Sequence, residues 1–347
     1  MKKIIALTLA LVLALSMAAC GAQEAPVETT EAPVVETTAA PETVPATEAS
    51  AAAPVNVMVL NGTTGFGMAN LMDAAVRGEA SQDYSFTVET DASNVVAGLV
   101  NGSVDIAALP TNAAATVYNK TQGGVQILTL NTKGVLYLVT NGSVAVESMA
   151  DLEGQTVYAP AQNPSFIFQH LVQANGLENV TIDNTYAQPA DLNSAVAAGE
   201  VSVAVLPEPM VTVARSKNPD LVVALDLTAE WDKVSPAGSL VQGCVVVRKA
   251  FVEENPGVVA KFLEEYGASI EALNADVEGT ATKIEENGIF TKAAVAAKAI
   301  PNCNVCFITG TEMQEAMASF LEIMFEVAPA SIGGSIPGDD FYCILNG

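Results

Sequence analysis

The sequence of 347 residues has a single histidine and a single tryptophan. The lone histidine, His170, excludes Ser-His-Asp and Cys-His catalysis unless it is itself the base. It lies in the apolar stretch 166–172, which has the pattern of an amphipathic helix, so we expect a structural histidine. This scarcity argues against an enzyme, and we expect neither a metal nor a cofactor.

Basic residues are also scarce. Residues 55–347 contain 33 Asp and Glu but only 12 Lys and Arg, which gives this part a net charge of −21. Such a surface repels nucleic acid and anionic lipid, so we exclude both as partners of this part. No apolar run beyond the N-terminal one approaches the length needed to span a bilayer.

Cysteine is sparse as well. Residues 55–347 contain Cys244, Cys303, Cys306 and Cys343. Cys303 and Cys306 have the spacing of a redox motif or of half a zinc site, but the second half is missing. A redox motif begins a helix after a strand, whereas apolar residues here predict the edge of a strand. We therefore expect buried thiols, and a disulfide stays open.

The first twenty residues have the pattern of an export signal. A charged start is followed by an apolar run from Ile4 to Leu15, which is too short for a mature membrane helix. Small Ala18 and Ala19 come directly before Cys20, and this arrangement resembles the lipobox of bacterial lipoproteins. The resemblance implies that Cys20 becomes the N-terminus and carries the lipid. The alternative is an ordinary secretory signal with a chance cysteine.

Residues 21–54 contain six Glu, no Lys or Arg, no aromatic residue, and repeated Thr-Thr and Ala-Pro units. Such a segment cannot bury a core, so we interpret 1–20 as signal peptide and 21–54 as a disordered acidic Thr/Pro tether. Proline and charge repulsion would extend it.

The most informative feature is a block that occurs twice, at an offset of 97 residues. Residues 94–111 read NVVAGLVNGSVDIAALPT, and residues 191–208 read DLNSAVAAGEVSVAVLPE. In both, a helical apolar pattern ends at a glycine, Gly102 or Gly199, a short strand follows, and Leu-Pro ends the strand. The repeat predicts two lobes, each with the same helix–strand–helix unit.

A looser strand–loop–helix unit precedes each block, beginning near 55 and near 155. Alternating strands and helices predict an α/β fold with two lobes and mostly parallel sheets. We expect a first lobe formed by 55–140 and 239–347. A second lobe, 141–238, is inserted in it, and two crossover strands join them.

These features together resemble the type II periplasmic binding proteins. The resemblance rests on the lipobox, the tether, Gly-x-Val-Asp-Ile-Ala at 102–107, the 151–157 segment DLEGQTV and Pro-Glu-Pro at 207–209. Over about 55–330 the chain is most similar to the nitrate, sulfonate, taurine and thiamine-precursor branch. The chain departs from the branch at Leu206, where an aromatic residue is usual, so the ligand stays open. The resemblance implies a monomer, held by lipid on the extracytoplasmic face of the cell membrane, that binds a small solute and ABC permease subunits.

Ligands of open α/β sheets bind beyond the carboxyl ends of strands, near helix N-termini. Four predicted loops fit this position, and their polar residues are Asn61, Thr63, Thr64, Thr111, Asn112, Gln162, Asn163, Ser165 and Glu208. The paired Leu-Pro ends predict that Thr111 and Glu208 face each other across a cleft. N-capping is the alternative role in the first and third loops. Glu208 would accept from an N–H or cationic group of the solute, or would instead complement the dipole of its own helix.

Two further residues have an expected place. For Trp231 we expect the role of a half-buried structural residue, and the alternative is a stacking platform for a flat solute. Lys133 is the basic residue nearest to the predicted cleft. The sequence leaves two classes of solute as alternatives. One is an anion held by helix N-termini and hydroxyls, and the other is a neutral or weakly cationic heterocycle.

The sequence is compatible with three alternative functions. The first is an extracellular solute-binding lipoprotein that delivers a solute to an ABC importer, and the others are a surface lipoprotein in signalling or adhesion and a small-molecule lyase. Some menaquinone-pathway lyases resemble this fold. The export signal and the lack of a histidine or cysteine nucleophile setting count against a lyase, so the first function is our hypothesis.

Overall fold

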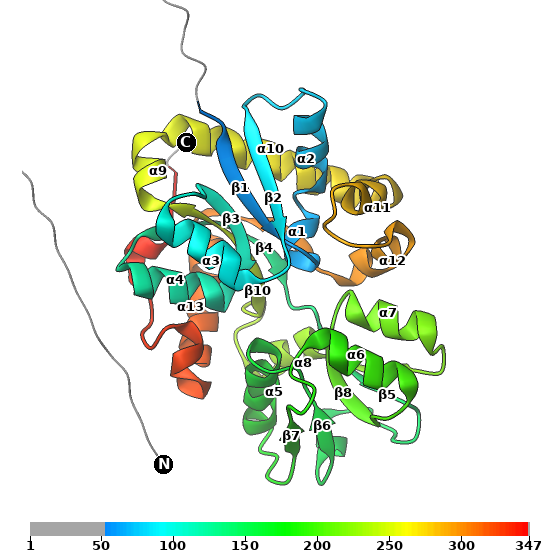
Figure 1. Cartoon of the computed structure of the whole chain (residues 1–347). Helices are drawn as coiled ribbons and strands as arrows, with labels where there is room; N and C mark the ends of the chain where they lie inside the picture. Colours follow the sequence, from blue (N-terminus) through cyan, green and yellow to red (C-terminus); the bar gives the residue numbers. More distant parts are fainter. Residues whose placement is uncertain (1–52, 346–347) are drawn as a thin grey trace, which may run out of the picture. The chain divides into compact units, whose positions relative to one another are not determined.

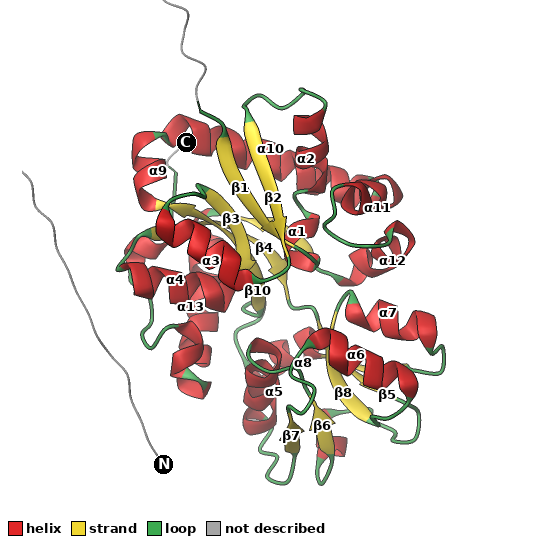
Figure 2. Cartoon of the chain, viewed as in Figure 1, coloured by secondary structure: helices red, strands yellow, loops and turns green. Residues whose placement is uncertain are grey.

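The computed structural model describes residues 53–345, so the predictions for the signal peptide, Cys20 and nearly all of the tether lie outside the described range. The described part is built of strands that alternate with helices (Figures 1 and 2). Its α-helices are α1 Thr63–Phe66, α2 Ala69–Val76, α3 Ala92–Asn101, α4 Thr111–Thr121, α5 Asn163–Ala174, α6 Pro189–Ala198, α7 Met210–Lys217, α8 Leu227–Val234, α9 Lys249–Glu254, α10 Pro256–Ala275, α11 Val277–Glu286, α12 Ala293–Ala299 and α13 Gly310–Val327. Short 3₁₀ turns are η1 Met149–Leu152, η2 Ile300–Asn302, η3 Pro329–Ile332 and η4 Asp339–Phe341.

The strands form two sheets. The first has the order β11-β4-β10-β3-β1-β2, and the second has the order β7-β6-β8-β5-β9. The strands of the first sheet are β1 Val55–Leu60, β2 Tyr84–Glu89, β3 Ile106–Pro110, β4 Val125–Lys133, β10 Val241–Arg248 and β11 Val305–Ile308. Those of the second are β5 Leu136–Thr140, β6 Thr156–Tyr158, β7 Thr181–Asp183, β8 Val203–Pro207 and β9 Val222–Asp226.

Most strands of each sheet run in one direction. In the first sheet β1, β2, β3 and β4 share a direction, while β10 and β11 oppose it. In the second sheet β6, β7, β8 and β9 share a direction and β5 opposes it. The predicted α/β fold with two lobes is confirmed, but the sheets are mixed rather than mostly parallel, because four of the nine strand pairs are parallel and five are antiparallel.

The expected boundary after Thr140 needs a correction, because β5 belongs to the second sheet. β5 pairs with β8 and β9, so the chain leaves the first sheet after Lys133 rather than after Thr140. We define the first lobe as 53–133 with 241–345, and the second lobe as 136–226. The crossovers are then 134–135 and 227–240.

The sequence repeat has the same boundaries in both lobes. Helix α3 and helix α6 are 97 residues apart at both ends, and so are strands β3 and β8. Each helix ends at a glycine in the left-handed region, Gly102 with φ 80° and Gly199 with φ 78°. Glycine suits this position because a Cβ atom there is strained. The prediction that these two glycines hold equivalent places is confirmed.

The buried apolar side chains form three clusters. One cluster belongs to the first lobe and includes Phe66 and Tyr266, and a smaller one belongs to the second lobe and includes Leu192. The third runs through both lobes, from Phe320 on α13 through Trp231 on α8 to Phe168 on α5. One side of the molecule therefore has a core that the two lobes share. Within residues 53–345, no helix is long and apolar enough to cross a membrane.

Candidate functional site

The two lobes meet at two of the predicted site residues. Thr63, at the start of α1, donates its hydroxyl to the backbone carbonyl of Glu208 at 2.9 Å. Both residues are buried, with 8% of Thr63 and 4% of Glu208 exposed. A second bond, from the Tyr137 hydroxyl on β5 to the Asn302 carbonyl at 2.9 Å, also joins the lobes. The loops after β1 and β8 are thus in direct contact.

A pocket of about 490 Å³ lies beside this contact. Its walls come from both lobes, since α7 and β9 belong to the second and α12 and η2 to the first, and α7 contacts α12. It is lined by Tyr137, Glu208, Val211, Thr212, Arg215, Ser216, Pro219, Val223, Lys298 and Asn302. Its volume falls in the range of small-molecule sites.

Glu208 is held by its own helix. One carboxylate oxygen accepts from the Thr212 N–H at 3.1 Å, and the other accepts from the Thr212 hydroxyl at 2.9 Å. Burial raises the pKa of Glu208, and these bonds from Thr212 partly offset the rise. The arrangement is that of a capped helix start, which was the alternative to solute contact.

Thr111, the equivalent residue of the first lobe, does not point at Glu208. It is fully buried, and its hydroxyl donates to the carbonyl of Val241 on β10 at 2.8 Å. The predicted pair across the cleft is therefore replaced by Thr63 and Glu208. The prediction assumed that the residue after each strand points outward. However, β10 lies beside β3, and its carbonyl at Val241 accepts the hydrogen bond of the Thr111 hydroxyl.

The other predicted residues lie on the same loops with different exposure. Asn61 is exposed, and the carbonyl of Thr64 accepts from Asn131. Asn112 donates to the Ser331 carbonyl at 3.5 Å, and Ser165 accepts from Asn184 at 2.6 Å. These residues make bonds inside their own lobe.

Gln162 and Asn163 start α5. Gln162 is exposed with φ 71°, a left-handed backbone that is uncommon outside glycine. Asn163 is buried, and its Oδ1 has no hydrogen-bond partner in the described part of the protein. A buried oxygen of this kind can accept from a bound molecule or water.

The sequence did not indicate the basic residues of the pocket. Arg215 on α7 and Lys298 on α12 line it from opposite lobes, and neither forms an ion pair among residues 53–345. The residue chosen from sequence, Lys133, lies instead in a separate pocket with Glu312 and Glu315.

His170 and Trp231 have structural roles. The indole of Trp231 is fully buried rather than half-buried, and its N–H donates to the Ser239 hydroxyl at 2.8 Å. His170 Nε2 lies 2.7 Å from the Ser235 hydroxyl, and its ring lies 4.7 Å from that of Trp231. Burial lowers the pKa of His170. Trp231 is part of the apolar cluster that the two lobes share, and His170 packs against Trp231.

The four cysteines of the described part are free thiols. Cys244, Cys303 and Cys343 are buried as expected, while Cys306 is half-buried. No cluster of three or more metal-binding side chains occurs in the described residues.

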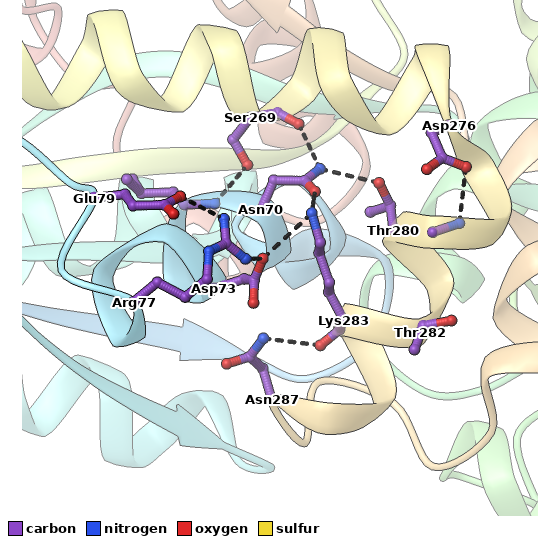
Figure 3. A network of polar contacts seen from close by, with 12 residues as sticks. Asn70, Asp73, Arg77, Glu79, Ser269, Asp276, Thr280, Thr282, Lys283 and Asn287 are labelled. Carbon is purple, nitrogen blue, oxygen red and sulfur yellow. Dashed lines mark hydrogen bonds and ion pairs between the residues drawn. The ribbon is translucent and has the colours of Figure 1, made fainter.

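A polar network holds the helices behind the first loop (Figure 3). The Asn70 side chain on α2 donates to the Ser269 carbonyl and to the Thr280 hydroxyl, both at 3.0 Å. Lys283 on α11 donates to Asn70 Oδ1 at 2.8 Å and pairs with Asp73 at 3.3 Å. The network joins α2, which follows α1 after two residues, to α10 and α11.

Comparisons with known proteins agree with this fold. A family model described as NMT1/THI5 like matches residues 80–278. Among solved structures, an ABC transporter protein from Parabacteroides distasonis is 23% identical, with a TM-score of 0.72, and the match covers 84% of this chain and 98% of that one. The periplasmic aliphatic sulphonate binding protein SsuA from Escherichia coli is 13% identical, with a TM-score of 0.65, and the match covers 81% of this chain and 95% of that one.

A ligand binding component of an ABC-type import system from Staphylococcus aureus, solved with zinc bound, is 12% identical, with a TM-score of 0.64. That match covers 84% of this chain and 96% of the other. No curated protein matches the sequence. At these identities the solved structures show that the fold is shared.

Proposed function

Because the chain belongs to the NMT1/THI5-like family, we propose that it is a solute-binding lipoprotein of an ABC importer. It captures a small solute between its lobes on the extracytoplasmic side of the cell membrane and delivers it to the permease subunits. The observation that carries this proposal is the pocket of about 490 Å³ with walls from both lobes. A solute in such a place touches both lobes at once and so favours their closed arrangement.

The charges of the pocket favour a solute with an anionic group. Arg215 and Lys298 reach the pocket without an ion-pair partner in the described part of the chain, although the protein is strongly acidic overall. The one carboxylate there, Glu208, is already bonded to Thr212. A carboxylate, sulfonate or phosphate could bond to both cations, whereas a cationic solute would meet them as like charges.

Native mass spectrometry of the purified protein with any co-purified solute tests capture. For the site, we expect Arg215→Gln and Lys298→Gln each to weaken binding by about tenfold, because each removes a charge-assisted hydrogen bond. Lys217→Gln and Lys292→Gln are matched controls, since these lysines lie at the ends of the same helices outside the pocket. Equal affinities in all four variants would remove the pocket from the proposal. Absence of any bound solute would count against capture itself.

The lipid anchor is a separate proposal that rests on the sequence around Cys20. We expect Cys20→Ala to prevent lipidation, so that the protein is released or stalls as a precursor instead of being held by lipid. Partition into detergent, measured for the wild type and the variant, checks this. A variant that loses its signal and still partitions like the wild type would show that Cys20 is not the lipid site.

A further inference from the structure

The bond between Thr63 and Glu208 joins the lobes without using a side chain of the second lobe. The acceptor is the backbone carbonyl of Glu208, and the donor is a hydroxyl that is 8% exposed. The carboxylate of Glu208 points to Thr212 instead. This contact is therefore available whether or not a solute occupies the pocket.

Cys303 lies against the same contact. Its Sγ is 3.8 Å from the Thr63 hydroxyl, and the residue follows Asn302, whose carbonyl accepts the second bond between the lobes from Tyr137. Cys303 is fully buried in this arrangement. Burial, and secondly the nearby charge of Glu208, raises the pKa of the Cys303 thiol. Cys303 belongs to the apolar cluster of the first lobe and lies next to the contact between the lobes, and its thiol is unreactive while it is buried.

We propose that the Thr63 hydroxyl is a closure latch that holds α1 of the first lobe against the Glu208 carbonyl of the second lobe, without solute, and that opening this latch uncovers Cys303. A protein with an open and a closed arrangement changes its populations by the free energy of any contact made in only one of them. The latch bond is such a contact, since its donor and acceptor belong to different lobes. The latch proposal requires only that the lobes move relative to each other, so it does not depend on which solute binds.

The experiment uses the protein's own thiols as reporters. The purified protein, free of solute, is treated with a maleimide under native conditions, and the rate at each cysteine is read from its peptide by mass spectrometry. Cys303 reports on opening of the lobes. Cys244 reports on unfolding, because it is fully buried in β10 and its thiol donates to the Leu109 carbonyl inside the first lobe.

The test variant is Thr63→Val, which keeps the shape of the side chain and removes its hydroxyl. One lost hydrogen bond changes an equilibrium by about two- to tenfold, and the Glu208 carbonyl is left without its donor. We expect labelling of Cys303 to be faster by about threefold or more, with labelling of Cys244 unchanged. Thr63→Ser retains the hydroxyl, and we expect it to label at the wild-type rate.

Thr111→Val is the matched control for a lost buried hydroxyl. Its bond to the Val241 carbonyl lies inside the first lobe, so its loss should leave labelling of Cys303 unchanged. A Cys303 rate that stays within about twofold in Thr63→Val would overturn the latch. Equal acceleration at Cys303 and Cys244 would also overturn it, because it would show unfolding rather than opening. If the labelling rates support the latch but the protein binds no solute, the proposed function is rejected and the latch is retained.

Discussion

The two lobes start from the same repeated unit and differ in the residue that follows it. In the first lobe the strand β3 leads to Thr111, whose buried, neutral hydroxyl donates to the Val241 carbonyl. In the second, β8 leads to Glu208, whose carboxylate caps its own helix and borders the pocket. The duplicated backbone fixes where the residue lies, and the side chain at that place decides whether it bonds to a neighbouring strand or to the helix that follows it.

The lobes also differ in what holds them together. Five strands of the first sheet, in the order β2-β1-β3-β10-β4, correspond to the order β7-β6-β8-β5-β9 of the second. The first lobe adds β11 and the helices α9 to α13, and it has a large cluster of its own. The second lobe has a smaller cluster and depends more on the shared core.

The largest expected effect comes from breaking the shared core. Trp231→Ala removes a fully buried indole that packs against Phe320 and His170, and we expect a loss of about 3–5 kcal/mol in the free energy of unfolding. Chemical denaturation measures this loss. Val100→Ala is the control, because Val100 is an exposed apolar residue. A loss below about 1 kcal/mol for Trp231→Ala would show that the lobes do not rely on a common core.

A smaller effect tests whether the lobes are equivalent. Gly102→Ala and Gly199→Ala each place a Cβ atom on a left-handed backbone where no neighbouring atom lies within 4 Å. The cost is then conformational alone, about 1–2 kcal/mol in each lobe. Gly257→Ala is the control, since Gly257 lies in α10 with equally open space and no positive φ. Unequal losses at Gly102 and Gly199 would break the equivalence, and thermal melting of the three variants compares them.

The smallest effect concerns a pH dependence that, of the two equivalent positions Thr111 and Glu208, only Glu208 should show. Burial raises the pKa of Glu208, so the stability linked to its protonated form is present below its ordinary value near 4.5 and is lost as the pH rises through the raised pKa. Glu208→Gln lacks this titration. We expect the stability of the wild type relative to this variant to fall as the pH rises through that window, as melting scans at several pH values would show.

The first-lobe counterpart supplies the control. Thr111→Val should lower stability by a similar amount at every pH, because no charge is involved. The bonds to Thr212 also predict that Glu208→Gln keeps its affinity for the solute within about threefold. A tenfold loss of affinity would instead support the direct solute contact predicted from sequence.

The sequence reveals the local units and misses what is assembled from distant parts. The repeat could be recognised because the periodicity, the glycine and the Leu-Pro end all lie within about twenty residues, and the structure reproduces both copies. The sheet to which β5 belongs could not be predicted, since it depends on pairing with β8 and β9 more than sixty residues away. Arg215 and Lys298 share a pocket only because α7 meets α12.

The position of β10 has a consequence for the order in which the chain can fold. This strand lies between β3 and β4 in the first sheet, yet it follows the whole second lobe in sequence. Until synthesis reaches Arg248, β3 and β4 have no partner between them, and the first sheet stays divided. We therefore expect the first sheet to form only after β10 has been made. Limited proteolysis of a chain shortened to residue 240 should accordingly find β1 to β4 unprotected, because β10 is the strand that joins the two parts of the first sheet.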